Sequence, residues 1–470
     1  MVVAPETRFT SVGQVVAGVL AALATGVAFA AGAVPLAVHS GLWGLVGGGW
    51  SHPIVFGMPV LLLALVAATL NGRLSGWWLA AAGLAVQAVV GLLPALAGGA
   101  VEPGLPQGAT ALATIAGAGL ALGGAVLAVG QVARPARPVV GAALVTGLLL
   151  QPALPFARPD RVDDFGFDLV LWVTLAVVTV AATTARHQRS TVPGRSAASR
   201  WVTVMVVAAV ATTVRVVQVW RGGSTSSLRG DPAAVPLDVP WSAGLAILVA
   251  AVLTGYAWHV WRAAGVRWVL SAFAVGPAAL YAFGNTTGGG GSVTVLLVPA
   301  ALLTVVVAFA LVRYADRLVP WDAVALLVVA GAFPLVLRAH RAGRDDAVQL
   351  ALVLLCFGLA WAVGVARVTV RPDRPAAPVA GLLGFGFAAF LLGAQLLVPL
   401  WVADGWDAPM SRTFGTPALA GGAALVVAVF FLVEHWQGWA DSRTGVADGP
   451  ADPDAAPPPP SGPVTIEIER

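Results

Sequence analysis

Residues 201–220, WVTVMVVAAVATTVRVVQVW, form an uninterrupted apolar run that contains one charged residue, Arg215. A helix that crosses the hydrocarbon core of a bilayer needs about 20 mostly apolar residues. This run therefore predicts a membrane-spanning helix. Because a charged side chain inside a bilayer is costly, Arg215 is also a candidate functional position.

The composition of the whole chain agrees with this first stretch. Hydrophobic residues make up 58% of the 470 residues, charged residues 10%, and the mean hydropathy is +0.87, whereas soluble domains are roughly 45–50% apolar and about 25% charged. We expect an all-α polytopic integral membrane protein, a bundle of about 14 transmembrane helices. The predicted spans are 12–38, 53–70, 76–97, 108–132, 138–156, 166–185, 201–220, 241–261, 267–284, 292–312, 319–337, 347–367, 377–401 and 416–436.

The distribution of arginine predicts the orientation of these spans. With a cytoplasmic N-terminus, 17 of the 26 Arg residues lie in inner loops and termini, 8 lie in outer loops, and Arg215 lies within a span. Positively charged loops stay on the cytoplasmic side of a membrane. We therefore expect an N-in, C-in, multi-pass protein of the plasma membrane. Trp77, Trp78, Trp201, Trp220, Trp261, Trp321 and Trp401 lie near span ends, where an interfacial aromatic belt is expected.

Three segments divide the chain. Residues 1–11 form a short cytoplasmic N-terminus, residues 12–436 form the transmembrane helical domain, and residues 437–470 form a tail. The tail is acidic and rich in proline, with too little apolar surface to fold, so a disordered cytoplasmic segment is expected.

Arg215 belongs to a polar stripe on its predicted helix, because three polar residues recur at every third position: Thr212, Arg215 and Gln218. The Arg lies roughly 7 to 8 Å below the outer interface at about 1.5 Å rise per residue, so its side chain can reach the interface. The stripe is equally consistent with the wall of a substrate cavity, or with a structural ion pair to Asp168 or Asp238.

A second candidate site lies in the predicted outer segment LRAHRAGRDD, residues 337–346. Its candidate residues are Arg338, His340, Arg341 and Arg344. Arginine binds phosphate and carboxylate groups with two parallel hydrogen bonds, so this segment could collect an anionic headgroup. The alternative is a solvated loop that Asp345 and Asp346 partly neutralise.

Several classes of chemistry are excluded or disfavoured. All 26 basic residues are Arg, as in a GC-rich, actinobacterial genome, so the chain has neither a P-loop lysine nor a Schiff-base lysine. The single cysteine, Cys356, excludes a disulfide. The six His residues are dispersed, and no zinc-hydrolase or nucleophile-elbow motif is present. We predict no catalytic residue, no metal, no cofactor and no nucleic-acid partner.

An internal repeat is not evident in the sequence. Seven plus seven spans would form an inverted pair, and twelve plus two would suit a major-facilitator arrangement. The loop after the second span, NGRLSGWW, lacks the acidic and basic signature of that family, and the glycine and proline around Gly147 and Pro152 match its fifth-span motif only weakly. The sequence therefore identifies no family.

The polar stripe and the proline-interrupted spans favour a transporter or flippase-like protein that moves an amphiphilic or anionic compound without ATP. The expected partners are membrane lipids and an anionic or lipid-linked substrate. Two alternatives remain open. One is a non-catalytic scaffold of the cell envelope or of cell division, and the other is a lipid-linked sugar transferase or ligase that uses the outer Arg and His residues.

Overall fold

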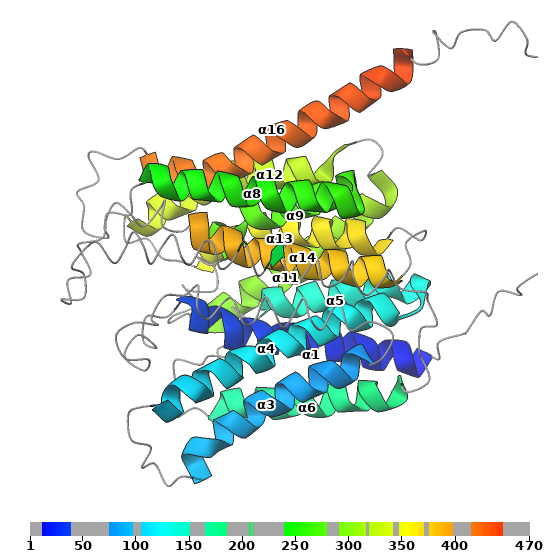
Figure 1. The fold of residues 1–470 in the computed structure, drawn as a ribbon, viewed down its shortest axis with the longest axis vertical. Helices are drawn as coiled ribbons and strands as arrows, with labels where there is room; N and C mark the ends of the chain where they lie inside the picture. Colours follow the sequence, from blue (N-terminus) through cyan, green and yellow to red (C-terminus); the bar gives the residue numbers. More distant parts are fainter. Residues whose placement is uncertain are drawn as a thin grey trace, which may run out of the picture.

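The computed structural model describes residues 12–38, 75–96, 105–150, 165–185, 206–207, 210, 239–279, 291–315, 319–341, 347–370, 376–397 and 415–444. Within these ranges all regular secondary structure is helical, and the helices lie side by side with their axes running across the view (Figure 1). They are α1 (Val12–Val38), α3 (Gly76–Leu96), α4 (Leu105–Gln131), a short 3-10 turn (Arg134–Ala136), α5 (Arg137–Leu150), α6 (Phe165–Thr184), α8 (Val239–Trp261), α9 (Ala263–Ala274), α11 (Gly291–Ala315), α12 (Trp321–Arg341), α13 (Ala347–Val370), α14 (Ala376–Leu397) and α16 (Gly415–Thr444).

The predicted spans agree with the described helices, and the all-α fold is confirmed. Each of these helices begins within about one turn of a predicted span. The span predicted at 53–70 lies outside the described residues. Of the span at 201–220, only Val206, Val207 and Val210 are described, and they are helical. Three described segments are each long and apolar enough to cross a membrane alone: Val12–Ala30, Ala243–Trp261 and Leu296–Ala315.

Two helices are longer than the sequence indicated. The α12 helix continues to Arg341, so Arg338 lies in its last turns rather than in a loop. The α16 helix continues to Thr444, beyond the predicted end of the transmembrane domain at residue 436. Figure 1 shows this end of α16 projecting past the other helices. The added segment of α16, residues 437–444 (QGWADSRT), is mostly polar, so hydropathy alone does not detect the extension.

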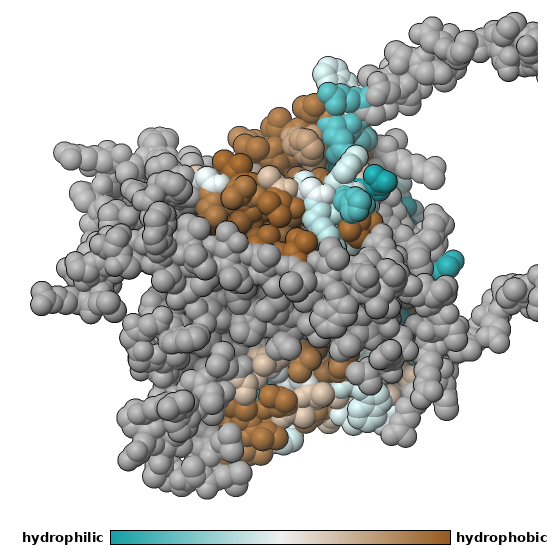
Figure 2. Space-filling view, in the orientation of Figure 1, coloured by the Kyte–Doolittle hydropathy of each residue, from teal (hydrophilic) through white to brown (hydrophobic). Residues whose placement is uncertain are grey.

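One end of the bundle carries most of the short connections between consecutive helices. Links join α4 to α5, α8 to α9, α11 to α12, and α13 to α14 there. The start of α1 and the end of α16 lie at the same side of the bundle (Figure 1). We call this side the inner end, following the arginine bias. Figure 2 shows hydrophilic side chains where α16 leaves the bundle, and apolar side chains over the outward faces of α8 and α16, as expected for surfaces that face lipid.

The helix pairings reveal an internal repeat. In the first set, α3 packs on α4 and α6, while α1 packs on α4, α5 and α6. In the second set, α12 packs on α13 and α16, while α9 packs on α13, α14 and α16. The helices α1, α3, α4, α5 and α6 therefore correspond to α9, α12, α13, α14 and α16. We call these sets the N half and the C half, with α11 a member of the C half that packs on α13. The helix α8 lies outside the repeat and packs on α9 and α14.

Glycine allows the tightest helix crossings in the N half. A Cβ atom on Gly83 of α3 would collide with the backbone of α4 at Gly117, and one on Gly124 would collide with α3 at Ala80. Helices in a bilayer associate closely where small residues face each other. In α4, Gly119 and Gly123 have the G-x-x-x-G spacing that is typical of close helix packing, and both are buried.

The link between α8 and α9 is a single strained residue. Arg262 has φ 60° and ψ −155°, a backbone conformation that glycine adopts readily and other residues rarely do. Replacing Arg262 with Gly should therefore stabilise the protein by about 1 kcal/mol, since strain of roughly 1 to 3 kcal/mol is released and about 0.5 to 1 kcal/mol is lost to chain entropy.

The buried thiol of Cys356 offers the measurement, because a maleimide dye reacts with it when heat unfolds the protein. The control is Arg262→Ala, which removes the same side chain but keeps the strain, and it should not raise the melting temperature. An equal gain from both variants would show that the Arg side chain, rather than the backbone, is unfavourable.

Candidate functional site

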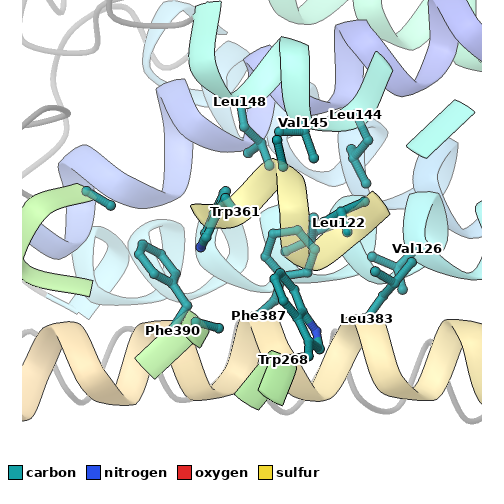
Figure 3. Packing of buried hydrophobic residues seen from close by; sticks show 14 of the residues in the cluster. Leu122, Val126, Leu144, Val145, Leu148, Trp268, Trp361, Leu383, Phe387 and Phe390 are labelled. Atoms are coloured by element: carbon teal, nitrogen blue, oxygen red, sulfur yellow. The ribbon is translucent and has the colours of Figure 1, made fainter. Parts of the chain in front are cut away.

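The N half and the C half meet along a continuous apolar surface. The helices α4 and α5 pack against α14 and α13, respectively, and α5 also packs against α11. We call this surface the seam, and Figure 3 shows the side chains that meet there. They are Leu122, Val126, Leu144, Val145 and Leu148 from the N half, and Trp268, Trp361, Leu383, Phe387 and Phe390 from the C half.

The centre of the seam is aromatic. Trp361 lies near the middle of α13 and makes edge-to-face contacts with three phenylalanine rings, with centroid separations of 4.6 Å to Phe390, 5.2 Å to Phe387 and 6.4 Å to Phe357. We call these four residues the aromatic cluster. Trp361 is 1% exposed. Such edge-to-face pairs each contribute about 0.5 to 1.5 kcal/mol beyond the burial of their surface.

The polar atoms around the seam differ in whether they are paired. The indole N–H of Trp268 donates to the carbonyl oxygen of Leu382 at 3.0 Å. In contrast, the indole N–H of Trp361 has no hydrogen-bond partner in the described part of the chain, and neither has the hydroxyl of Ser271. Both side chains are buried. An unpaired buried donor costs about 1 to 3 kcal/mol, so each of these groups calls for an explanation.

On the inner side of the aromatic cluster, Trp268 forms a wedge between two helices of the C half. Its ring occupies the space where a Cβ atom on Gly364 of α13 or on Gly386 of α14 would have to lie. It also contacts Phe387 edge-to-face at 6.4 Å. The wedge fixes the spacing of α9, α13 and α14, and with Val126 and Leu383 it fills the inner part of the seam (Figure 3).

A charged cluster joins the inner ends of three C-half helices. Asp322, in the first turn of α12, is 3% exposed. Its Oδ1 accepts from Nη2 of Arg267 of α9 at 3.0 Å, and its Oδ2 accepts from Nη1 of Arg367 of α13 through a short contact. The Nε of Arg267 lies 2.7 Å from Oδ2 and adds an ion pair without a hydrogen bond. The Oδ1 of Asp322 also accepts from the backbone N–H of Ala323 at 2.9 Å. The carboxylate is therefore fully paired, which buried charge requires.

Arg267 also connects α16 to this cluster. Its guanidinium lies over the ring of Phe431, 5.0 Å from the centroid, and its Nε is 3.9 Å from Oε2 of Glu434. Glu434 is 37% exposed, so this longer ion pair is partly screened by solvent.

The corresponding places in the N half hold neutral hydrogen bonds. At the pairing of α3 with α4, the backbone N–H of Gly76 donates to Oε1 of Gln131 at 2.8 Å. At the pairing of α1 with α6, Nε2 of Gln14 donates to the carbonyl oxygen of Thr184 at 3.0 Å. At these two helix pairings the N half therefore uses neutral hydrogen bonds where the C half uses ion pairs.

Most of the site residues predicted from the sequence are not tested by these observations. Thr212, Arg215, Gln218 and Arg344 lie outside the described residues. Arg338 is exposed near the end of α12, and His340 and Arg341 belong to the last turn of that helix. Asp168 lies in the first turn of α6, and Asp238 lies outside the described residues. Within the described ranges, no group of three or more His, Cys, Asp or Glu side chains could hold a metal ion.

Sequence reasoning missed the charged cluster, although a signal was present. Asp322, Arg267 and Arg367 each lie within or at the end of a predicted span, and the arginine bias places all three at the inner side. Considered alone, each of these charged residues is consistent with a position at the membrane interface. A buried ion pair would have been predicted if their common depth had been considered together.

Comparisons with known proteins establish the class of the fold. No protein-family model and no curated protein matches the chain. Solved structures do match. A peptide transporter, POT, in complex with sulfate is 16% identical, with a TM-score of 0.52 and coverage of 92% of this chain and 96% of that one. The xylose transporter XylE from E. coli, in a partially occluded inward-open conformation, is 13% identical, with a TM-score of 0.52 and coverage of 89% and 96%.

The human organic anion transporter MFSD10 (TETRAN) is 13% identical, with a TM-score of 0.51 and coverage of 90% of this chain and all of that one. These proteins are major facilitator transporters. The chain therefore has the major facilitator fold, which is that of a multi-pass integral membrane protein. The sequence argument against this arrangement was wrong at the level of fold. It depended on a loop motif, whereas the fold depends on helix pairings that small and apolar residues determine.

Proposed function

We propose that this protein is a secondary transporter of the plasma membrane, which moves an amphiphilic or anionic compound between two pseudo-equivalent halves without ATP. The observation that carries the proposal is the repeat of helix pairings in the N half and the C half, which meet at the apolar seam. Transporters built from repeats bind substrate at the repeat interface and expose it alternately to each side.

The chemistry of the seam supports an amphiphilic substrate. Its described side chains are apolar or aromatic, and the buried charged residues in the described ranges, Arg137 and Asp322, lie at the inner end. An apolar surface with a few hydrogen-bonding groups is typical of sites for small organic molecules. An anionic group on the substrate would need arginine, which the predicted polar stripe at Arg215 and the outer residues Arg338, His340, Arg341 and Arg344 would supply. Among the structural neighbours, one is an organic anion transporter and another was solved with sulfate.

Transport into proteoliposomes tests the proposal. We expect an ion gradient to drive uptake of an aromatic anion, anilinonaphthalene sulfonate, or of an uncharged aromatic amphiphile, phenylnaphthylamine, but not of xylose. If the anion is carried through the polar stripe, Arg215→Leu should abolish uptake of the anion and leave uptake of the uncharged compound. Absence of gradient-driven uptake of either compound, in protein shown to be folded, would favour the scaffold alternative.

A further inference from the structure

The aromatic cluster contains a hydrogen-bond donor that has no acceptor among the residues that the structure describes. Trp361 is 1% exposed, and the ring edges and faces of Phe357, Phe387 and Phe390 surround it. Phenylalanine rings offer no conventional acceptor, so the indole N–H loses its hydrogen bond to water without receiving another. A phenylalanine at this position would avoid that cost.

Other tryptophans of the chain show that a partner can be built. The N–H of Trp268 donates to Leu382, and the N–H of Trp321 donates to the carbonyl oxygen of Ala315 at 3.2 Å. The N–H of Trp261 is unpaired as well, but its side chain is only partly buried and lies at the inner end of α8. Trp361 combines full burial, a central depth and an unpaired donor.

A second unpaired donor lies one helical turn from the Trp268 wedge. The buried threonine hydroxyls of α1, α5, α6, α11 and α13 all donate to the carbonyl oxygen four residues earlier: Thr25, Thr146, Thr174, Thr304 and Thr369. Ser271 could make the same bond but does not. It lies on the same face of α9 as Trp268, three residues along the helix.

We infer that the aromatic cluster is a binding site for an uncharged aromatic or alicyclic group, and that the indole N–H of Trp361 donates to a hydrogen-bond acceptor on that group, such as a carbonyl or ether oxygen. Figure 3 shows Trp361 between Leu148 of the N half and Phe390 of the C half, with the indole nitrogen on the Phe390 side. Separation of the halves therefore uncovers the indole ring, and a ligand reaches the N–H when the Phe390 ring also shifts. Ser271 of the neighbouring helix α9, buried and without a partner in the described part of the chain, is the candidate for a second donor. The inference rests on the proposed function, since it assigns the substrate class of the same seam.

The experiment compares two ligands of nearly equal shape. Acetylnaphthalene has a carbonyl acceptor and ethylnaphthalene has none. The full chain is placed in lipid nanodiscs, and labelling of Cys356 by a maleimide dye reports its thermal unfolding. The affinity of each ligand is obtained from the rise in melting temperature as the ligand concentration increases. We expect wild-type protein to bind acetylnaphthalene about tenfold more tightly, the value of one net hydrogen bond. In Trp361→Phe the two ligands should bind within about twofold of each other.

Two further variants keep the result interpretable. Benzothienylalanine incorporated at position 361 retains the shape of the bicyclic ring but lacks the N–H, so it should lose the preference without any loss of stability. Trp321→Phe removes a paired N–H outside the seam, so it should lower the melting temperature while the preference remains.

The inference is overturned if wild-type protein does not prefer the carbonyl ligand, or if the position 361 variants keep the preference. The transport assay is separate: selective binding without uptake refutes only the proposed function, and uptake with unchanged selectivity in Trp361→Phe refutes only the site.

Discussion

Asp322→Ala is expected to destabilise the protein by about 3 to 5 kcal/mol, because it leaves the guanidinium groups of Arg267 and Arg367 without their shared buried partner. Removing one member of a buried ion cluster exposes the full desolvation cost of the remaining charges. The loss should appear as earlier labelling of Cys356 in thermal denaturation. Poor insertion into the membrane is the expected result in cells.

Neutralising one arginine tests whether the loss arises from charge. In the double variant Asp322→Ala with Arg367→Leu, Arg267 still has Glu434 within 3.9 Å, so part of the stability should return. Glu434→Gln is the matched control within the same cluster, since its carboxylate is half-exposed and its loss should cost less than about 1 kcal/mol. Equal losses for Asp322→Ala and Glu434→Gln would contradict the assignment of Asp322 as the centre of the cluster.

Gly147→Ala should cost several kcal/mol, on the order of 3, because α1 and α5 cross at a distance that only glycine permits. A Cβ atom on Gly147 would overlap the carbonyl oxygen of Leu23, and a Cβ atom on Gly26 would lie 2.5 Å from the carbonyl oxygen of Leu144. Backbone atoms cannot rotate away as a side chain can, so the two helices must separate. The N half should then melt at a lower temperature.

Glycines in open positions provide the control. A Cβ atom on Gly255 of α8 or Gly331 of α12 would meet nothing within 4 Å. Alanine has a higher helix propensity than glycine, so Gly255→Ala and Gly331→Ala should be neutral or stabilising by up to about 1 kcal/mol. If Gly147→Ala behaves like these two, the close crossing of α1 and α5 is not a determinant of stability.

Much of the fold could be predicted from the sequence, because hydropathy acts on each helix separately. The starts of the described helices agree with the predicted spans, since burial in lipid requires apolar residues all round a helix and leaves a continuous run. The helix ends were predicted less well. Polar residues continue α12 to Arg341 and α16 to Thr444. The aromatic belt was also only partly correct, because Trp77 is buried in the core whereas Trp78 is half-exposed.

The candidate site was much less predictable. Prediction from the sequence selected Arg215 and the arginines that follow Leu337, because a charge in an apolar run is visible without knowledge of its neighbours. Trp361 was invisible, since an indole in an apolar span is ordinary until its hydrogen-bond partners are known. Hydrogen bonds of glutamine between helices were equally hard to predict: the side-chain amide of Gln87 is buried and has no partner in the described part of the chain, whereas Gln131 and Gln14 make such bonds.

Hydropathy and composition are enough to identify a helical membrane protein, to locate the starts of its described helices, and to show that it has no lysine and no internal disulfide. These properties depend on composition and on periods of a few residues. The packing of the helices was needed to show that two halves repeat the same pairings, that Asp322 pairs with Arg267 and Arg367, and that the N–H of Trp361 has no partner among the described residues. Each of these features depends on contacts between helices that are distant in the sequence. In a bilayer every spanning helix is similarly hydrophobic, so close packing and polar pairing select which helices meet.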